Sequence, residues 1–259
     1  MTMQDYIDPT WRPILERNEL GDFDALWRLE AGWLEEPNRK RKGWSGVSKI
    51  PLALPDGTLA WVYLKRQEDN NTLSWRHPIA GIPTFAREFH HIQRYRAFDI
   101  PTLDPVFFGV RTVAGKARAI LATVELSGFI ALDAWLAEEP RPRTQRLDCL
   151  DAVAATLRAM HRQRIRHSCF FPKHIFVRVN QTGGIELRII DLEKSRRIPL
   201  RVGCTLRDLD SLNRHASGWS RTDRLRFLLR YLGVSHVTPY ARWLWGRLTV
   251  RRAKKLGQG

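Results

Sequence analysis

The feature that most constrains the fold is a helix, a loop and a hairpin encoded between residues 160 and 193. An amphipathic helix ends near His161, and a polar loop that contains His167 follows it. The short apolar run at 175–177 predicts a buried strand, and residues 186–190 predict a second strand after a turn rich in Asn and Gly. This pattern predicts one supersecondary unit that holds a polar loop close to the end of a strand.

Two polar residues border the predicted hairpin. Asp191 follows its second strand directly, and a carboxylate at this boundary favours a metal ligand, because Mg²⁺ binds one or two carboxylates together with phosphate oxygens. The alternative for Asp191 is a helix N-cap or a turn residue. His174 precedes the first strand and could bind a metal or a phosphate, or could be satisfied inside the loop.

The first 125 residues are rich in predicted strands. Residues 43–54 and 59–65 predict a hairpin around the turn signal Pro55-Asp56-Gly57. A helix capped by Thr84 is expected to continue to about residue 98, and residues 106–124 predict a second hairpin. These patterns indicate a sheet with one helix inserted between its two hairpins.

Two charged residues in this region suggest a site for phosphate. Lys65 ends an apolar strand and could place its ammonium group on nucleotide phosphates, and Glu88 on the next helix could hold that lysine in an ion pair. The alternative is a lysine that extends into solvent and a solvated helix glutamate. Gly43 and Gly46 would allow a backbone to approach phosphates closely, although any tight turn uses glycines.

The remainder of the chain is mainly helical. Helices are expected at residues 130–137, 144–160, 205–215, 221–232 and 235–255. A β-rich half followed by a helical half predicts an α+β fold with two lobes, residues 1–125 and 126–259. Glu125 falls where the lobes would meet.

Charge and composition restrict the partners. The net charge is +16, and residues 194–259 supply most of it, so nucleic acid, an anionic glycolipid or an acidic membrane leaflet could bind. No zinc-finger, RNP or helix-turn-helix signature supports nucleic acid, which is therefore the least favoured partner. The C-terminal helix, with Trp243 and Trp245 among arginines, could dock on a membrane or could be ordinary core. Three dispersed cysteines and an N-terminus without an apolar signal segment favour the cytoplasm.

The chain resembles the protein-kinase-like superfamily, and within it the lipopolysaccharide core (Kdo/heptose) kinases and their InaA-like branch. The kinase pattern L-H-x-x-G-I-x-H-R-D-x-x-P-x-N can be aligned with residues 160–174, and Asp191-Leu192-Glu193 stands in the position of D-F-G. The residues that match that pattern are His161, Ile165, His167 and Pro172. The segment Pro83–Phe89, followed by Ile100-Pro101-Thr102, is similar to the InaA-like branch.

The resemblance implies an ATP- and Mg²⁺-dependent enzyme that transfers the γ-phosphate to a sugar hydroxyl, at the cytoplasmic face of the membrane. Lys65 and Glu88 stand where the family's strand lysine and helix glutamate belong, and together with Gly43, Gly46 and Glu125 they are the predicted nucleotide-binding residues. The resemblance assigns metal binding to Asp191 and His174, and catalysis to His167, Cys169 and Asp191.

Three of the departures from the kinase pattern bear on function. Cys169 stands in place of the catalytic-loop aspartate, His174 in place of the metal-binding asparagine, and Ser168 in place of the arginine. A thiol with an ordinary pKa of about 8.5 is mostly neutral at pH 7. His167 could serve as the base instead, although in ordinary kinases that histidine is structural. The alternative function is therefore a pseudokinase or scaffold in envelope stress or assembly. Asp208 or Asp210 would support the catalytic loop from below.

Overall fold

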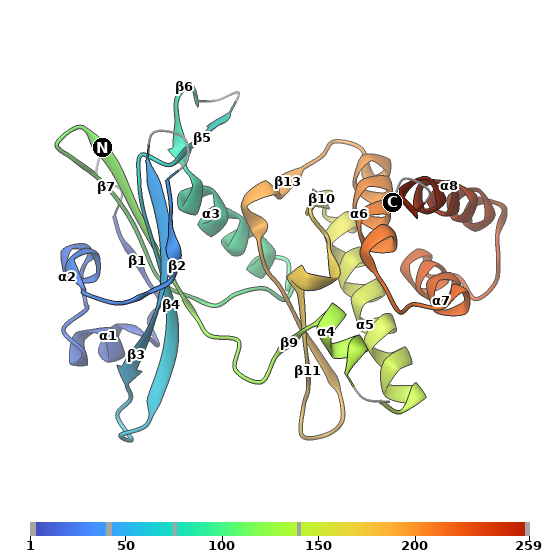
Figure 1. The fold of residues 1–259 in the computed structure, drawn as a ribbon, viewed down its shortest axis with the longest axis horizontal. Coiled ribbons are helices and arrows are strands. Elements are labelled where there is room, and N and C mark those ends of the chain that lie inside the picture. The colour runs from blue at the N-terminus through green and yellow to red at the C-terminus, as the bar shows by residue number, and fades with distance from the viewer. Residues whose placement is uncertain (1–3, 40–42, 75–76, 139–140, 257–259) are drawn as a thin grey trace. The chain divides into compact units, whose positions relative to one another are not determined.

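A computed structural model describes residues 4–39, 43–74, 77–138 and 141–256. The chain divides into two compact units. Unit 1 comprises residues 1–93 and 103–127, and unit 2 comprises residues 94–102 and 128–259 (Figure 1). The predicted boundary after residue 125 lies two residues before the one observed here, but residues 94–102 join the helical unit, which the sequence did not indicate.

Unit 1 is built on a six-stranded sheet with the order β1-β7-β8-β4-β3-β2, in which all neighbours are antiparallel. Its strands are β1 (Tyr6–Ile7), β2 (Trp33–Asn38), β3 (Trp44–Ala53), β4 (Leu59–Glu68), β7 (Pro105–Val113) and β8 (Lys116–Val124). The hairpins β3–β4 and β7–β8 confirm the two hairpins predicted from the sequence. The turn at Gly57 has a φ of 82°, which explains why glycine follows Pro55-Asp56 there.

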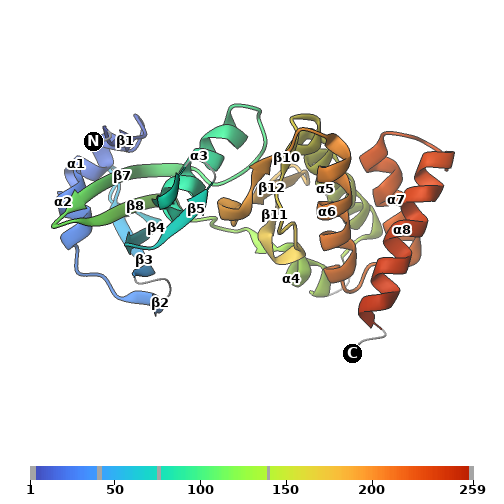
Figure 2. The same ribbon diagram turned by 90° about the horizontal axis from the view of Figure 1, so that it is seen from above.

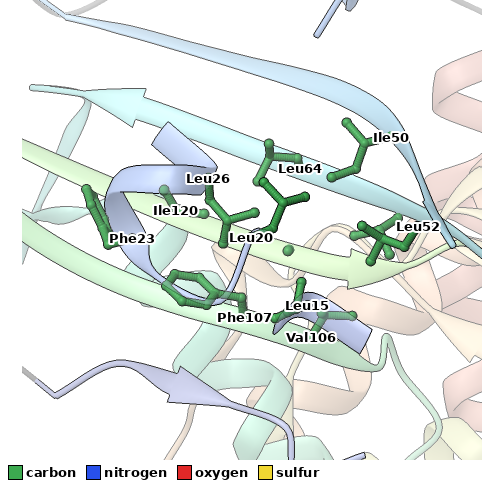
Figure 3. Packing of buried hydrophobic residues seen from close by; sticks show 12 residues of the cluster. Leu15, Leu20, Phe23, Leu26, Ile50, Leu52, Leu64, Val106, Phe107 and Ile120 are labelled. Atoms are coloured by element: carbon green, nitrogen blue, oxygen red, sulfur yellow. The ribbon is translucent and has the colours of Figure 1, made fainter. Parts of the chain in front are cut away.

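Two short helices, α1 (Arg12–Arg17) and α2 (Phe23–Arg28), cover one face of this sheet (Figure 1). Their apolar side chains pack on the inward-facing residues of β3, β4, β7 and β8, and together they form the core of unit 1 (Figure 3). Labelled examples from four elements are Leu15 of α1, Leu26 of α2, Leu64 of β4 and Phe107 of β7. The third helix, α3 (Thr84–Arg96), follows the small hairpin β5 (Asn71–Ser74) and β6 (His77–Pro83).

Unit 2 combines small sheets with five helices among its described residues. The hairpin β11 (Ile175–Val179) and β12 (Ile185–Ile189) pairs on its β11 side with β9 (Ile130–Ala131), and β10 (Ile165–Arg166) pairs with β13 (Arg196–Arg197). The helices are α4 (Leu132–Ala137), α5 (Arg143–Arg162), α6 (Arg201–His215), α7 (Arg221–Leu232) and α8 (Pro239–Leu256). Helix α5 lies beside α7, and α8 packs on α6 and α7 (Figures 1 and 2).

Several boundaries differ from the expected ones for local reasons. Helix α8 begins at Pro239 rather than at Ser235, because Thr238 accepts the Ala241 N–H and proline favours the first helical position. Helix α6 begins at Arg201, four residues before the expected start at residue 205. Residues 43–46 form no open turn, since β3 already begins at Trp44. No helix among the described residues is long and apolar enough to cross a membrane.

Candidate functional site in two groups of residues

The predicted ion pair of unit 1 is present. Lys65 Nζ lies 2.7 Å from Glu88 Oε1, and the Glu88 carboxylate is buried while Lys65 remains partly exposed. Lys65 lies on β4 in register with Val47 on β3 and Leu121 on β8, so its backbone is fixed on both sides. A short, partly buried pair of this kind holds the ammonium group in one position.

The helix that carries Glu88 is fixed at its start by side chains of the preceding segment. Gln67, fully buried on β4, accepts the Phe85 N–H with its Oε1 and donates its Nε2 to Asn70 O. The Thr84 hydroxyl also donates to Asn70 O, at 2.9 Å. These bonds satisfy groups at the helix N-terminus and set the direction from which Glu88 approaches the lysine. No sequence signal marks Gln67, because it stands in a polar run after Lys65.

The two candidate phosphate-loop glycines are explained by packing. A Cβ on Gly46, in the middle of the β3–β4 ladder, would lie 2.5 Å from the Trp33 ring on β2. A Cβ on Gly43 would collide with the backbone of Glu68 and Asp69. Neither glycine has a positive φ. Nucleotide binding by these glycines stays a prediction, and close packing alone is enough to require them.

Glu125 takes part in local contacts of unit 1. Its Oε1 lies 2.6 Å from Lys49 Nζ, its Oε2 accepts the Ser127 hydroxyl, and its backbone N–H donates to Trp61 O. The backbone bond extends the β4–β8 pairing past Val124. These contacts do not test whether Glu125 binds a nucleotide, which stays a prediction.

The polar loop of unit 2 is held from below by one buried carboxylate. Asp208, on α6, accepts the backbone N–H groups of His167 at 2.7 Å and Ser168 at 2.8 Å. It also lies 3.1 Å from His161 Nε2 at the end of α5. Of the two aspartates considered from the sequence, Asp208 therefore supports the loop. Asp210 instead contacts Arg214 at 3.0 Å.

A chain of buried hydrogen bonds extends this support to α7. His161 Nδ1 lies 2.7 Å from the Tyr231 hydroxyl, which in turn lies 2.9 Å from the Thr205 hydroxyl. When His161 donates from Nε2 to Asp208, its Nδ1 accepts from Tyr231, and every member of the chain is satisfied. Sequence reasoning did not find this connection, because His161 and Tyr231 are distant in the chain and no local pattern links them.

His167 is held within the protein. Its ring is fully buried, its Nε2 lies 2.9 Å from Ile190 O, and its Nδ1 accepts the Cys169 N–H at 3.3 Å. Burial lowers the pKa of His167 to about 4, so the neutral ring donates from Nε2. Both ring nitrogens are thus bonded to the backbone. This geometry favours a structural role over the expected role as a base.

Cys169 stands where the resemblance to kinases predicts a catalytic aspartate. Its side chain is half-buried, and burial raises the thiol pKa, an effect that the nearby Lys194 opposes. The backbone O of Cys169 accepts the Phe171 N–H and lies 2.9 Å from His174 Nδ1. A thiol whose pKa is above its ordinary value is neutral at pH 7 and is a poor proton acceptor.

Asp191 is held in an unusual backbone conformation at the end of β12. Its φ and ψ of 60° and 55° are left-handed, a region that aspartate enters more readily than most non-glycine residues. The preceding residue is fixed because the Ile190 N–H donates to His174 O. The Asp191 carboxylate lies 3.4 Å from His174 Nδ1 and is partly exposed.

These residues fit a magnesium ion with one protein carboxylate. Among the described residues there is no group of three or more His, Cys, Asp and Glu side chains suited to hold a metal, and Mg²⁺ needs only one or two carboxylates beside phosphate oxygens and water. Asp191 would hold the ion. His174 already faces Cys169 O and Asp191 with one nitrogen, and Mg²⁺ prefers oxygen, so His174 is better placed to orient the carboxylate.

A cluster of cations adjoins the loop. β10 and β13 place Arg166 directly opposite Arg196, and Arg197 follows on the same short strand. Lys194 and Arg207 act electrostatically on Cys169. In the described part of the chain, no carboxylate lies within ion-pair distance of these four arginines, and like charges across a ladder repel. The cluster therefore favours the binding of an anion.

An antiparallel sheet with a lysine–glutamate pair on a strand and a helix, and a supported loop followed by a hairpin and an aspartate, define a protein-kinase-like fold. The solved structure titled "WaaP in complex with acyl carrier protein" has this fold. It superposes with a TM-score of 0.68 at 20% identity, covering 97% of this chain and 98% of the other. The α+β fold expected from the sequence is thereby confirmed.

Sequence comparison identifies the family. The model of the "Lipopolysaccharide kinase (Kdo/WaaP) family" matches residues 24–231, and the chain belongs to this family. The chain is also similar to "Protein InaA" of Escherichia coli (strain K12), with 33% identity over 179 residues, 68% of this chain and 79% of that protein. The resemblance inferred from the motif is therefore confirmed, and the family supports a kinase of the lipopolysaccharide-core type.

Proposed function

We propose that this protein transfers the γ-phosphate of ATP to a sugar hydroxyl of the lipopolysaccharide core, at the cytoplasmic face of the membrane. The proposal rests on two charged groups, the Lys65 ammonium and the Asp191 carboxylate, that neighbouring residues hold in place. Lys65 lies 2.7 Å from its buried partner Glu88, and Asp191 is held left-handed beside His174. Phosphoryl transfer depends mainly on positioning and on charge stabilisation, which these groups supply.

The residues have distinct roles in this proposal. Lys65 binds nucleotide phosphates, and Glu88 keeps the ammonium group aimed at them. Asp191 would hold Mg²⁺, which when bound neutralises charge on the phosphates. Asp208 fixes the loop at His167 and Ser168, so that the Cys169 backbone stays in place.

The acceptor is proposed to be anionic. The cluster formed by Arg166, Arg196 and Arg197 offers guanidinium groups next to the loop, and these bind phosphate and carboxylate oxygens in pairs. A lipopolysaccharide core carrying acidic groups matches this charge. Family membership supports the same class of acceptor.

A second candidate is a nucleotide-binding pseudokinase, and Cys169 is the observation that favours it. Burial raises the thiol pKa, and the neighbouring His167 has both ring nitrogens bonded, so the loop offers no strong proton acceptor at this position. A loose transition state needs little help from a base, which keeps the enzyme as the first candidate.

The test is a calorimetric titration of ATP, with and without Mg²⁺, on the native protein and on Asp191→Ala. Metal-dependent binding that disappears in the variant supports the kinase-type site. Transfer of labelled phosphate to deacylated core oligosaccharide then separates the candidates, because an enzyme turns over and a pseudokinase only binds. An absence of ATP binding in the native protein would contradict both.

A further inference from the structure

The outer face of α8 carries an exposed aromatic and basic stripe. Tyr240, Trp243, Arg247 and Val250 are spaced by three and four residues, so they lie along one side of the helix. The exposed fractions of Tyr240, Trp243 and Val250 are 49%, 44% and 57%. We call these four residues the α8 stripe.

The α8 stripe is separate from the face that anchors the helix. Ala241, Leu244 and Leu248 are buried against α6 and α7, and Asn213 of α6 donates to Leu248 O at 3.0 Å. The expectation that this helix is ordinary core thus holds for Leu244 and Leu248, whereas Trp243 faces outward. A helix that is anchored on one side presents the other side as a rigid surface.

The members of the stripe are ordered against one another. The rings of Tyr240 and Trp243 stack with centroids 5.7 Å apart and planes inclined by 21°, and the Arg247 guanidinium lies 5.3 Å from the Trp243 ring centre. From Tyr240 to Val250 the stripe spans about 15 Å parallel to the helix axis. A straight stripe of this length can lie in a plane.

Every charged residue of α8 itself is basic. No aspartate or glutamate follows Asp223 in the sequence, while nine lysines and arginines lie between Arg224 and Gly259. Arg242 and Arg247 are exposed on α8 itself. An anionic surface is therefore attracted to this end of unit 2, and a cationic one is repelled.

We propose that the α8 stripe docks unit 2 on the surface of an anionic lipid bilayer. Tyrosine and tryptophan favour the bilayer interface, because their rings are apolar and their polar atoms reach water. Arginines beside them pair with acidic headgroups. Val250 argues against nucleic acid, since an exposed aliphatic side chain gains from lipid but cannot stack on a base. This docking does not depend on phosphoryl transfer.

The experiment is flotation of the full chain with vesicles of phosphatidylcholine alone or mixed with phosphatidylglycerol. The native protein is expected to float with the mixed vesicles and to stay in solution with phosphatidylcholine. Tyr240→Ser/Trp243→Ser should lower the partition coefficient about tenfold, because apolar contact is lost. Arg242→Gln/Arg247→Gln should lower it roughly fivefold for each arginine.

Matched controls separate the stripe from general effects. Phe98→Ser removes an aromatic ring with an exposed fraction of 44%, equal to that of Trp243, at another surface of unit 2. Arg12→Gln/Arg17→Gln removes the same charge from α1 in unit 1. Both controls should partition as the native protein does. Val250→Asp supplies a second test within the stripe if the aromatic pair lowers the unfolding midpoint.

The proposal is overturned if the native protein does not float with acidic vesicles. It is also overturned if the aromatic pair and Val250→Asp both partition like the native protein, since binding would then be electrostatic only. Equal losses for the two arginine pairs would show that total charge, and not α8, determines binding. None of these results bears on whether ATP binds.

Discussion

The two groups of candidate site residues differ in which of their predicted parts are present. In unit 1, the predicted ion pair is complete, with Lys65 and Glu88 in direct contact. In unit 2, the support of the loop is complete, because Asp208 accepts two backbone N–H groups, but the position predicted for a catalytic aspartate carries the thiol of Cys169. The hydrogen bonds that support the loop are thus independent of the side chain at the candidate catalytic position.

The loop at residues 167–169 keeps its backbone conformation although position 169 carries no aspartate. Asp208 and His161 hold the backbone at residues 167 and 168, and His167 closes it onto Ile190. None of these bonds involves the side chain at position 169. The loop geometry therefore gives no measure of activity, and experiments must address support and chemistry separately.

The largest effect is expected from removal of the support. Asp208→Ala leaves two backbone N–H groups and His161 without their acceptor in a fully buried site, so the free energy of unfolding should fall by about 3–5 kcal/mol. Urea unfolding followed by circular dichroism measures this loss. Asp210→Ala on the same helix is the control and should cost about 1 kcal/mol, since its partners Arg214 and Arg251 are both partly exposed. Equal losses would contradict the assignment of Asp208 as the support.

The buried His167 predicts a loss of stability in acid. Its pKa is about 4 in the folded protein and about 6.5 in an unfolded chain, so the unfolded state takes up the proton first as the pH falls. Stability is complete above pH 6.5 and should decrease by about 3 kcal/mol as the pH falls to about 4. Urea midpoints across this interval test the slope. His167→Gln should be less stable at pH 7 but should flatten the slope, and an unchanged slope would exclude His167 as its source.

Restoring the carboxylate tests the chemistry of unit 2. Cys169→Asp places a proton acceptor on a loop that is already supported, so phosphate transfer to deacylated core oligosaccharide should rise roughly a hundredfold. The affinity for ATP should stay within about twofold, because Lys65 and Asp191 are unchanged. Cys169→Ser is the control and should give no increase. A native rate that Cys169→Asp does not raise would mean that this position needs no base.

The contacts that the sequence predicted are those with a local signature. A lysine at the end of an apolar strand and a glutamate on the next helix predicted the pair Lys65–Glu88, and a strand end predicted Asp191. The motif over 160–174 also located the loop. These features depend on the order of strands and helices along the chain, which local residue patterns predict.

The contacts that could not be predicted depend on packing between distant segments. Tyr231 meets His161 only because α7 lies beside α5, and Gly46 faces Trp33 only because β2 pairs with β3. The choice between Asp208 and Asp210 likewise depends on the rotation of α6 about its axis. Neighbouring residues on a helix point in different directions, and composition does not fix which one faces the loop.

A moderate effect is expected from breaking the pair in unit 1. Glu88→Gln keeps the shape of the side chain but removes the charge that holds Lys65, so ATP affinity should fall about tenfold. Glu186→Gln is the control, because Glu186 forms an equally direct pair with Arg178, at 2.6 Å, on the β11–β12 hairpin. Calorimetric titration of both variants with ATP measures the two affinities. Similar losses in both would show that net charge controls the affinity, and not the pair.

The smallest effect separates packing from phosphate binding at Gly46. Gly46→Ala places a Cβ 2.5 Å from the Trp33 ring, which is exposed enough to shift, so the free energy of unfolding should fall by about 1 kcal/mol. Gly32→Ala is the control, since a Cβ there meets nothing within 4 Å. If packing alone requires the glycine, ATP affinity is unchanged by Gly46→Ala. When Trp33→Ala is present in the same chain, Gly46→Ala should no longer lower the free energy of unfolding, because the two residues are coupled. A selective loss of ATP affinity with stability retained would instead place the Gly46 backbone against the nucleotide, and unit 1 would then contribute more than its ion pair.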